Sequence, residues 1–232
     1  MDSNEKCGFI PRTLKHFSED WGEKWWRRAI GGKWEELGEL QFNFMKDNGL
    51  EPHHCLLDIG CGSLRGGVHF IKYLDAGHYY GLEKEEDLIY AGEMFEIPEH
   101  GLEDKCPVFI NNDNFDMSGA DVKFDYMIAQ SIFTHILPDK IKQCLVEMKK
   151  VLAEDGKFYA TFHKPKPGKG KVEDGIQMDL RLHPCRAGEY KGPRYTKSFL
   201  ITMAESVGLK ATYIGKWGHA RKQLMILFEN AQ

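Results

Sequence analysis

The chain has 232 residues, of which 42% are hydrophobic and 28% charged, so it is long enough for one full-sized domain with an extension but hardly for two domains. A formal net charge of −4 argues against a protein that binds nucleic acid regardless of sequence, because such proteins need a basic surface. The six cysteines include no C-x-x-C pair, which argues against a zinc site or a dense disulfide framework and favours reduced thiols in the cytoplasm.

Residues 1–50 are rich in aromatic and charged residues, and we expect them to form a helical cap ahead of a domain at 51–232. They contain no apolar signal-peptide core, and no stretch of the chain approaches ~18 uncharged apolar residues, so neither a signal peptide nor a membrane span is expected. The run WEELGELQFNFMKDNGL has its apolar residues at roughly helical spacing and Gly49 as a C-terminal stop.

From residue 55 onwards, short apolar runs alternate with helical patterns. We expect strands at 55–59, 78–83, 107–111, 124–130 and 157–163. Helices are expected at 65–74, 87–95 and 140–152. This alternation predicts right-handed crossovers and therefore an α/β fold with a mostly parallel sheet.

The pattern changes in the last third of the chain. Residues 164–195 open with the basic run KPKPGKGK and show no clear periodicity, which predicts a long functional or disordered loop. The basic run is either a solvated loop or an electrostatic guide for an anionic acceptor. Beyond it, Thr196 is a plausible N-cap of a helix that stops at Gly208. Strand-like runs at 210–217 and 222–229, joined by GHAR, then predict antiparallel pairing at a sheet edge.

The turn LLDIGCGSLRGG at 56–67 has the glycines of a nucleotide-binding loop. It contains no lysine for a triphosphate, and Arg65 stands where the dinucleotide fingerprint needs its third glycine. Asp58, just ahead of the first glycine, would oppose phosphates but attract a cation. S-adenosylmethionine carries a sulfonium and an ammonium group and no phosphate, so this turn favours it.

Acidic residues after the next two strands support the same ligand. Glu83 ends the second strand, where a carboxylate can accept hydrogen bonds from both ribose hydroxyls. Asp113 follows the third strand, within reach of an adenine amino group. The alternatives are a solvated residue in the charge run EKEED for Glu83 and ordinary turn chemistry in NNDN for Asp113.

The motifs LLDIGCG, YYGLE, NNDNFD, FDYMIAQSIFTHI and LAEDGKFYATF, in this order and spacing, resemble class I S-adenosylmethionine-dependent methyltransferases. The resemblance covers residues 55–163 motif by motif and the C-terminal elements more loosely. It implies a doubly wound, seven-stranded sheet of order 3-2-1-4-5-7-6 with strand 7 antiparallel, and S-adenosyl-L-methionine as cofactor with S-adenosyl-L-homocysteine as product. One departure is Leu64, where the family's D-x-G-x-G-x-G would place glycine.

The resemblance also implies where the cofactor lies. Asp58 would act directly or through water, Glu83 would hold the ribose, and the remaining positions fall into groups. Those at the amino-acid end are Gly60, Cys61 and Gly62, with Ser63 and Arg65 in the same turn. Those at the adenine are Asp113 and Asn114, and those beside the reacting methyl are Gln130 and Ser131. Aromatic residues of the N-terminal cap are either its buried side or part of a lid over the cofactor: Trp21, Trp25, Trp26 and Trp34.

Two histidines are candidates for a general base, because an imidazole titrates near neutral pH. His135 lies in SIFTHI after the fourth strand, and His163 ends the fifth. The alternative for His135 is a packed or capping histidine ahead of Pro138. The adjacent His53 and His54 share no helix face, so no metal is expected.

The acceptor is predicted by elimination. The fourth strand ends in AQSI rather than in an N-P-P-Y-type sequence, and no cysteine pair suggests chemistry at pyrimidine carbon 5. A hydroxyl of a small molecule or sugar is therefore the leading hypothesis, with neither a nucleic acid nor a membrane as partner. Two alternatives remain open at this point: a methyltransferase acting on protein or RNA, and a protein that binds S-adenosylmethionine without transferring its methyl.

Overall fold

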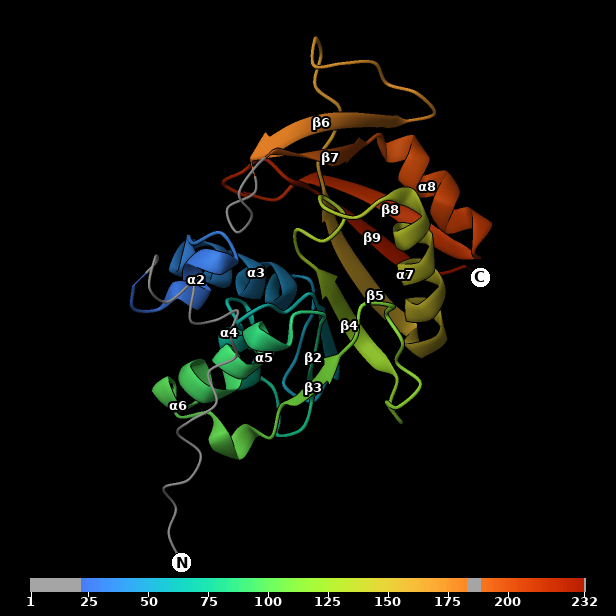
Figure 1. The fold of residues 1–232 in the computed structure, drawn as a ribbon. Helices are drawn as coiled ribbons and strands as arrows, with labels where there is room; N and C mark the ends of the chain where they lie inside the picture. Colours follow the sequence, from blue (N-terminus) through green and yellow to red (C-terminus); the bar gives the residue numbers. More distant parts are fainter. Residues whose placement is uncertain (1–21, 183–188, 232) are drawn as a thin grey trace, which may run out of the picture.

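The computed structural model describes residues 22–182 and 189–231, and seven of their strands form one sheet of order β3-β2-β1-β4-β5-β9-β8 (Figure 1). Neighbouring strands from β3 to β5 are parallel, and β9 is antiparallel to both β5 and β8. This is the strand order expected from the sequence, with its antiparallel last strand. The strands are β1 (Leu56–Ile59), β2 (Tyr79–Glu83), β3 (Val108–Asn111), β4 (Phe124–Ala129), β5 (Leu152–Phe162), β8 (Leu209–Lys216) and β9 (Leu224–Asn230).

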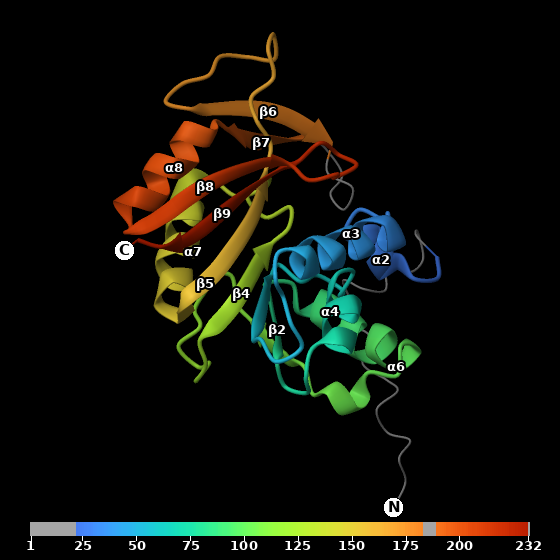
Figure 2. The ribbon, with the colours of Figure 1, turned by 180° about the vertical axis from the view of Figure 1, so that it is seen from behind.

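Helices cover both faces of the sheet, as the two opposite views show (Figures 1 and 2). On one side lie α7 (Pro138–Val151) and α8 (Lys197–Ser206), the latter capped at Thr196 as expected. On the other side lie α2 (Trp25–Ala29), α3 (Trp34–Asp47), α4 (Gly67–Tyr73), α5 (Glu86–Ala91), the π-helix η1 (Gly92–Glu96), α6 (Ile97–Glu99) and the 3-10 turn η2 (Glu103–Lys105). No helix in the described ranges is long and apolar enough to cross a bilayer.

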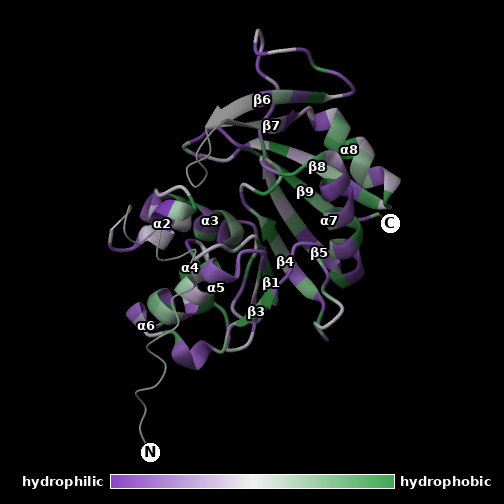
Figure 3. Ribbon diagram, in the orientation of Figure 1, coloured by the Kyte–Doolittle hydropathy of each residue, from purple (hydrophilic) through white to green (hydrophobic). Residues whose placement is uncertain are grey.

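The core is divided by the sheet because side chains alternate between its faces. Leu57 and Ile59 of β1 pack with α7 and α8 in one cluster, whereas Leu56 packs with α3 and α4 in the other. Figure 3 shows hydrophobic residues along these central strands. A strand buried on both faces reads as a continuous apolar run, which is why the sequence identifies β1 and β4 so clearly.

Residues 164–195 differ from the expected irregular loop. Two of their segments, β6 (Ile176–Leu182) and β7 (Glu189–Tyr195), pair antiparallel as a separate two-stranded sheet. The pattern of burial explains why these strands were not predicted from the sequence. Gln177 is polar and only 1% exposed, whereas its apolar neighbour Met178 is 41% exposed. The Gln177 amide bonds the backbone of Lys166 and Gly170, so polar contacts hold the hairpin to the preceding loop.

Candidate active site

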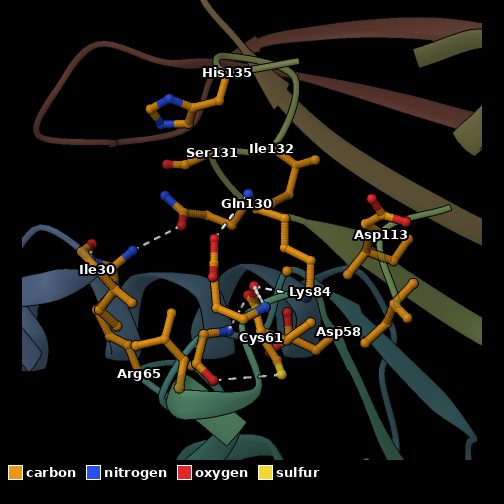
Figure 4. Close-up of a pocket in the computed structure, with 18 of the residues that line it drawn as sticks. Ile30, Asp58, Cys61, Arg65, Lys84, Asp113, Gln130, Ser131, Ile132 and His135 are labelled. Carbon is orange, nitrogen blue, oxygen red and sulfur yellow. Dashed lines mark hydrogen bonds and ion pairs between the residues drawn. The ribbon is translucent and has the colours of Figure 1, made fainter. Parts of the chain in front are cut away.

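A cavity of about 770 Å³ lies at the carboxyl ends of β1 to β4, which is where ligands bind in open α/β sheets (Figure 4). Its volume is in the range of small-molecule and cofactor sites. Asp58 and Cys61 lie on one side of it, and Ser131 and His135 lie across from them. Sequence positions far apart, from the N-terminal helices to the end of β4, therefore meet around one space.

The glycine turn after β1 forms the floor of the cavity. Gly60 and Gly62 have φ values of 73° and 57°, a region that favours glycine. A β-carbon on Gly60 would overlap the side chain of Ile132, and one on Gly62 would lie 2.8 Å from Ile30 Cγ2. Both glycines are thus required by backbone conformation and by the close approach of neighbouring segments.

Leu64, the departure from the family pattern, takes the left-handed conformation itself, with φ 74°. Its side chain is fully buried. It fits because glycines flank it: a β-carbon on Gly67 would lie 2.9 Å from Leu64 Cδ2, and one on Gly92 would lie 2.8 Å from Leu64 Cγ. The turn therefore holds a left-handed residue at this position while inserting a core side chain.

Asp58 is 3% exposed and accepts a hydrogen bond from the Tyr79 hydroxyl at 3.0 Å. Burial raises the pKa of Asp58 to about 7, with the Glu83 charge also raising it and Tyr79 and Arg65 lowering it. A buried carboxyl with this pKa gains from a positive ligand beside it, because that ligand stabilises the ionised form.

Glu83 is held by three backbone N–H groups. Gly62 donates to Oε2 at 3.1 Å, and Lys84 and Glu85 donate to Oε1 at 2.9 and 3.0 Å. Burial raises the pKa of Glu83, whereas these hydrogen bonds lower it. A carboxylate has about four acceptor positions, so Glu83 retains one on Oε2 that could accept from a ligand hydroxyl.

Beyond β3, Asp113 lines the cavity, with its carbonyl accepting from Lys140 Nζ at 3.3 Å. Asn112 lines it as well, and this position was not predicted because the run NNDN has no periodicity that would single out one residue. Asn114 is not among the lining residues. Its Oδ1 instead accepts from the Asp116 N–H at 3.2 Å, an ordinary turn contact.

Gln130, at the end of β4, lies between two buried side chains. Arg65 Nη2 donates to Gln130 Oε1 at 2.9 Å, and Gln130 Nε2 lies 2.8 Å from His219 Nε2. No sequence pattern points to His219, because it lies in the loop between β8 and β9, and only the antiparallel return of β9 brings that loop to the end of β4. Arg65 also donates to the carbonyls of Ile30 and Gly32, which fastens the cap to the turn.

Ser131 has φ 66° and is held by two buried polar side chains. Its N–H donates to Thr161 Oγ1 at 2.7 Å, and Gln223 Nε2 donates to its Oγ at 2.8 Å. Of the two histidine candidates, His135 lines the cavity and His163 does not. The His163 carbonyl accepts from the Tyr195 N–H at 2.8 Å, so this residue anchors the β6–β7 hairpin.

The N-terminal helices reach the cavity through Trp25 and Ile30. Helix α2 is fastened to η1 by Glu96, which accepts from Trp26 Nε1 and from Arg27 Nε and Nη2. Ser63 lies away from the cavity lining, and its hydroxyl donates to the Trp26 carbonyl at 3.0 Å. Trp34 is buried in this region, whereas Trp21 lies outside the described residues.

No metal centre is evident in the described ranges, which contain no group of three or more histidine, cysteine, aspartate or glutamate side chains placed to hold an ion. The cysteines Cys55, Cys61, Cys106 and Cys144 are free thiols. Cys61 is part of the glycine turn, and burial raises the pKa of its thiol.

Residues 57–158 match a family model described as a methyltransferase domain. The glycopeptide N-methyltransferase MtfA, complexed with S-adenosylmethionine, is similar with TM-score 0.64 and 13% identity, over 84% of this chain and 94% of that one. The CcbJ methyltransferase from Streptomyces caelestis has TM-score 0.64 and 15% identity, over 84% and 90%. Magnesium protoporphyrin IX methyltransferase from Synechocystis PCC 6803, with bound S-adenosylmethionine, has TM-score 0.62 and 12% identity, over 97% and 99%.

The strand order and the cavity above a glycine turn define the Rossmann-like fold of class I methyltransferases. The methyltransferase-domain match runs from β1 into β5 and so includes the turn and the strand ends that build the cavity. The protein thus contains a methyltransferase-domain segment at residues 57–158, on the fold that it shares with these solved methyltransferases.

Proposed function

We propose that the protein transfers the methyl group of S-adenosylmethionine to a hydroxyl of a small molecule or sugar. The observation that carries this proposal is the position of His135, whose side chain lines the same cavity as Asp58 and Glu83 and lies across it from Asp58 (Figure 4). An imidazole in that position can take the proton that a hydroxyl loses on methylation.

The donor's place in the cavity follows from the charges and hydrogen-bonding groups. Asp58 stabilises the positive charge of the donor, and the remaining acceptor position of Glu83 takes a ribose hydroxyl. Asp113 and Asn112 face the adenine, while Cys61 and the glycines beside it contact the amino-acid end. The bound donor supplies a methyl carbon activated by a sulfonium leaving group.

Transfer is an in-line displacement in which the acceptor oxygen forms a bond to the methyl carbon as the carbon–sulfur bond breaks. His135 holds the proton released from the hydroxyl. Positioning of the two reactants contributes most of the acceleration, on the order of 7–11 kcal/mol for well-aligned pairs. Ser131 is fixed by Thr161 and Gln223, so the segment that carries His135 starts from a rigid point.

Labelled S-adenosylmethionine and pools of hydroxylated metabolites test the acceptor. We expect label in a small-molecule product; label confined to protein or RNA, or in an N-methylated product, would contradict the proposal. No transfer to any pool, with the donor still bound, would indicate a binding protein without methyltransferase activity toward these acceptors.

A matched pair of variants tests His135. His135→Asn should lower kcat about 100-fold or more with an unchanged affinity for the donor, because general-base catalysis contributes ~10²–10⁴-fold. His163→Asn makes the same change outside the cavity lining and should leave kcat nearly unchanged. An equal decrease in kcat in the two variants would contradict the assignment of His135 as the general base.

A further inference from the structure

A continuous chain of polar contacts leads from the cavity into the loop between β8 and β9, residues 217–223. Arg65 Nη2, Gln130 and His219 follow one another at 2.9 and 2.8 Å, and the Arg221 N–H then donates to His219 Nδ1 at 3.1 Å. Arg65 and Gln130 line the cavity, whereas His219, 6% exposed, lies behind them.

This series of hydrogen bonds contains one donor more than it has acceptors. A guanidinium and a backbone N–H only donate, a glutamine amide has one accepting end, and a neutral imidazole has one accepting nitrogen. Suppose that Arg65 donates to Gln130 Oε1 and that Gln130 Nε2 donates to His219 Nε2. The proton of the neutral imidazole is then on His219 Nδ1, where two donors, Nδ1–H and the Arg221 N–H, face each other. If the Gln130 amide is flipped, so that Oε1 and Nε2 exchange places, its Nε2 donor faces the Arg65 Nη2 donor instead. One acceptor is therefore missing from the buried network.

Protonation of His219 would add a further donor to this network. The groups around His219 disfavour its protonated form. Burial, with the charges of Arg65 and Arg221, lowers the pKa of His219 to about 4. Arg65 itself bonds only carbonyl and amide oxygens, from Ile30, Gly32 and Gln130. The buried guanidinium of Arg65, which has no bonded carboxylate, and the nearby charge of the exposed Arg221 make this end of the cavity favourable for an anion.

We propose that His219 is a positioning residue for the carboxylate at the amino-acid end of the methyl donor. With a carboxylate in the cavity, Arg65 Nη2 and Gln130 Nε2 both donate to it. Gln130 Oε1 then accepts from His219 Nε2–H, and His219 Nδ1 accepts from the Arg221 N–H, so that every donor in the chain is matched. This inference rests on the proposed placement of the donor in this cavity.

Calorimetric titration of the unmodified protein with two ligands is the first test: S-adenosylhomocysteine and its decarboxylated counterpart, which has the same amine but no carboxylate. We expect S-adenosylhomocysteine to bind about 10- to 100-fold more tightly, the range for hydrogen bonds to a charged group. Equal affinities would overturn the inference and leave the placement of the donor intact. Failure of both ligands to bind would overturn that placement, and this inference with it.

Substitutions at two positions, Gln130 and His219, test this network of hydrogen bonds. Gln130→Glu keeps the size of the side chain and places a negative charge beside the carboxylate site, so the preference should reverse in favour of the decarboxylated ligand. His219→Phe should reduce the preference for S-adenosylhomocysteine to a few-fold, whereas His219→Gln, which retains a donor toward Gln130, should restore most of it. His53→Phe, a histidine on an exposed loop, is the matched control.

A purely structural role for His219 gives a different result: His219→Phe would then weaken both ligands by the same factor, which would overturn the inference. Thermal unfolding without ligand shows whether that variant folds. If it does not, His219→Gln decides the question: it should keep most of the preference for S-adenosylhomocysteine, and loss of the preference in that variant would overturn the inference.

Discussion

Leu64 occupies the space next to Gly92, so that a β-carbon added to Gly92 would lie 2.8 Å from Leu64 Cγ. This contact joins the glycine turn to the π-helix η1. The left-handed backbone of Leu64 costs roughly 1–2 kcal/mol. Removal of a buried leucine side chain costs ~2–5 kcal/mol. Burial therefore outweighs the backbone strain, and leucine at this position is a net gain wherever residue 92 has no side chain.

Gly92→Ala and Leu64→Gly should be strongly coupled. In the unmodified protein, Gly92→Ala should destabilise the fold by about 1–3 kcal/mol, because the added methyl overpacks against Leu64. In the Leu64→Gly background the space is open, and alanine's helix propensity should make Gly92→Ala neutral or stabilising by up to ~1 kcal/mol. Urea unfolding of the four proteins measures the coupling. The same cost in both backgrounds would show that the two residues act independently.

Affinity for S-adenosylmethionine should rise between pH 6 and pH 8. Asp58 has a pKa raised to about 7 by burial, and the positive ligand favours its ionised form. Below that pH the carboxyl must first lose a proton, so the affinity should fall by up to tenfold per pH unit. Calorimetry across this range provides the measurement, and Asp58→Asn should show a flatter profile. An unchanged slope in that variant would assign the pH dependence to another group.

The same residue should reduce stability at high pH when no ligand is present. Because the folded-state pKa of Asp58 lies above its ordinary value of 3.8, the folded protein retains a proton that the unfolded chain releases. Stability from this group is therefore complete below pH 4 and is lost as the pH rises to 7, by on the order of 4 kcal/mol. Asp58→Asn should be more stable than the unmodified protein at pH 8 and nearly equal to it at pH 4 by denaturant unfolding. A stability difference that does not change with pH would contradict this prediction.

Glu96→Gln should release helix α2 from the rest of the protein. Glu96 is fully buried and accepts from Arg27 and Trp26, and removal of one partner of a buried ion pair costs ~3–5 kcal/mol. We expect faster amide hydrogen exchange in α2 and, because Trp25 and Ile30 line the cavity, weaker binding of the donor. Glu99→Gln is the matched control: Glu99 contacts the same arginine but is 43% exposed. Similar exchange rates in the two variants would show that the buried contact does not hold the helix.

Much of the fold could be predicted from the sequence, because strands buried on both faces are continuous apolar runs and their alternation with helices determines a parallel order. The β6–β7 hairpin could not, since its buried residue is the polar Gln177 and the apolar Met178 faces outward. The helix expected at 87–95 begins as α5 and widens into η1, where the fit of Leu64 against Gly92 depends on a contact distant in the sequence.

The candidate site also contains some residues that could be predicted from the sequence and others that could not. Asp58 and Glu83 lie near the carboxyl ends of β1 and β2, and Gln130 directly follows β4. The topology places the ends of parallel strands along one edge, so their approach could be predicted. His219 could not be assigned, because its contact with Gln130 spans 89 positions and depends on the path of β9. The conformation of Leu64 was also beyond sequence reasoning, since its φ value follows from packing and not from residue type.

The antiparallel pairing of β9 with β5 has a consequence for the order in which the site is completed during synthesis. Arg221, in the loop before β9, donates to the Gly31 carbonyl, so a segment made early and a segment made late close the same wall of the cavity. During synthesis, the glycine turn and the first five strands emerge well before that loop exists. A nascent chain that ends at β5 has the acidic side chains of the site but lacks His219 and Arg221. With the donor placed as proposed, we expect methyl-donor binding to tighten once the last hairpin has been added.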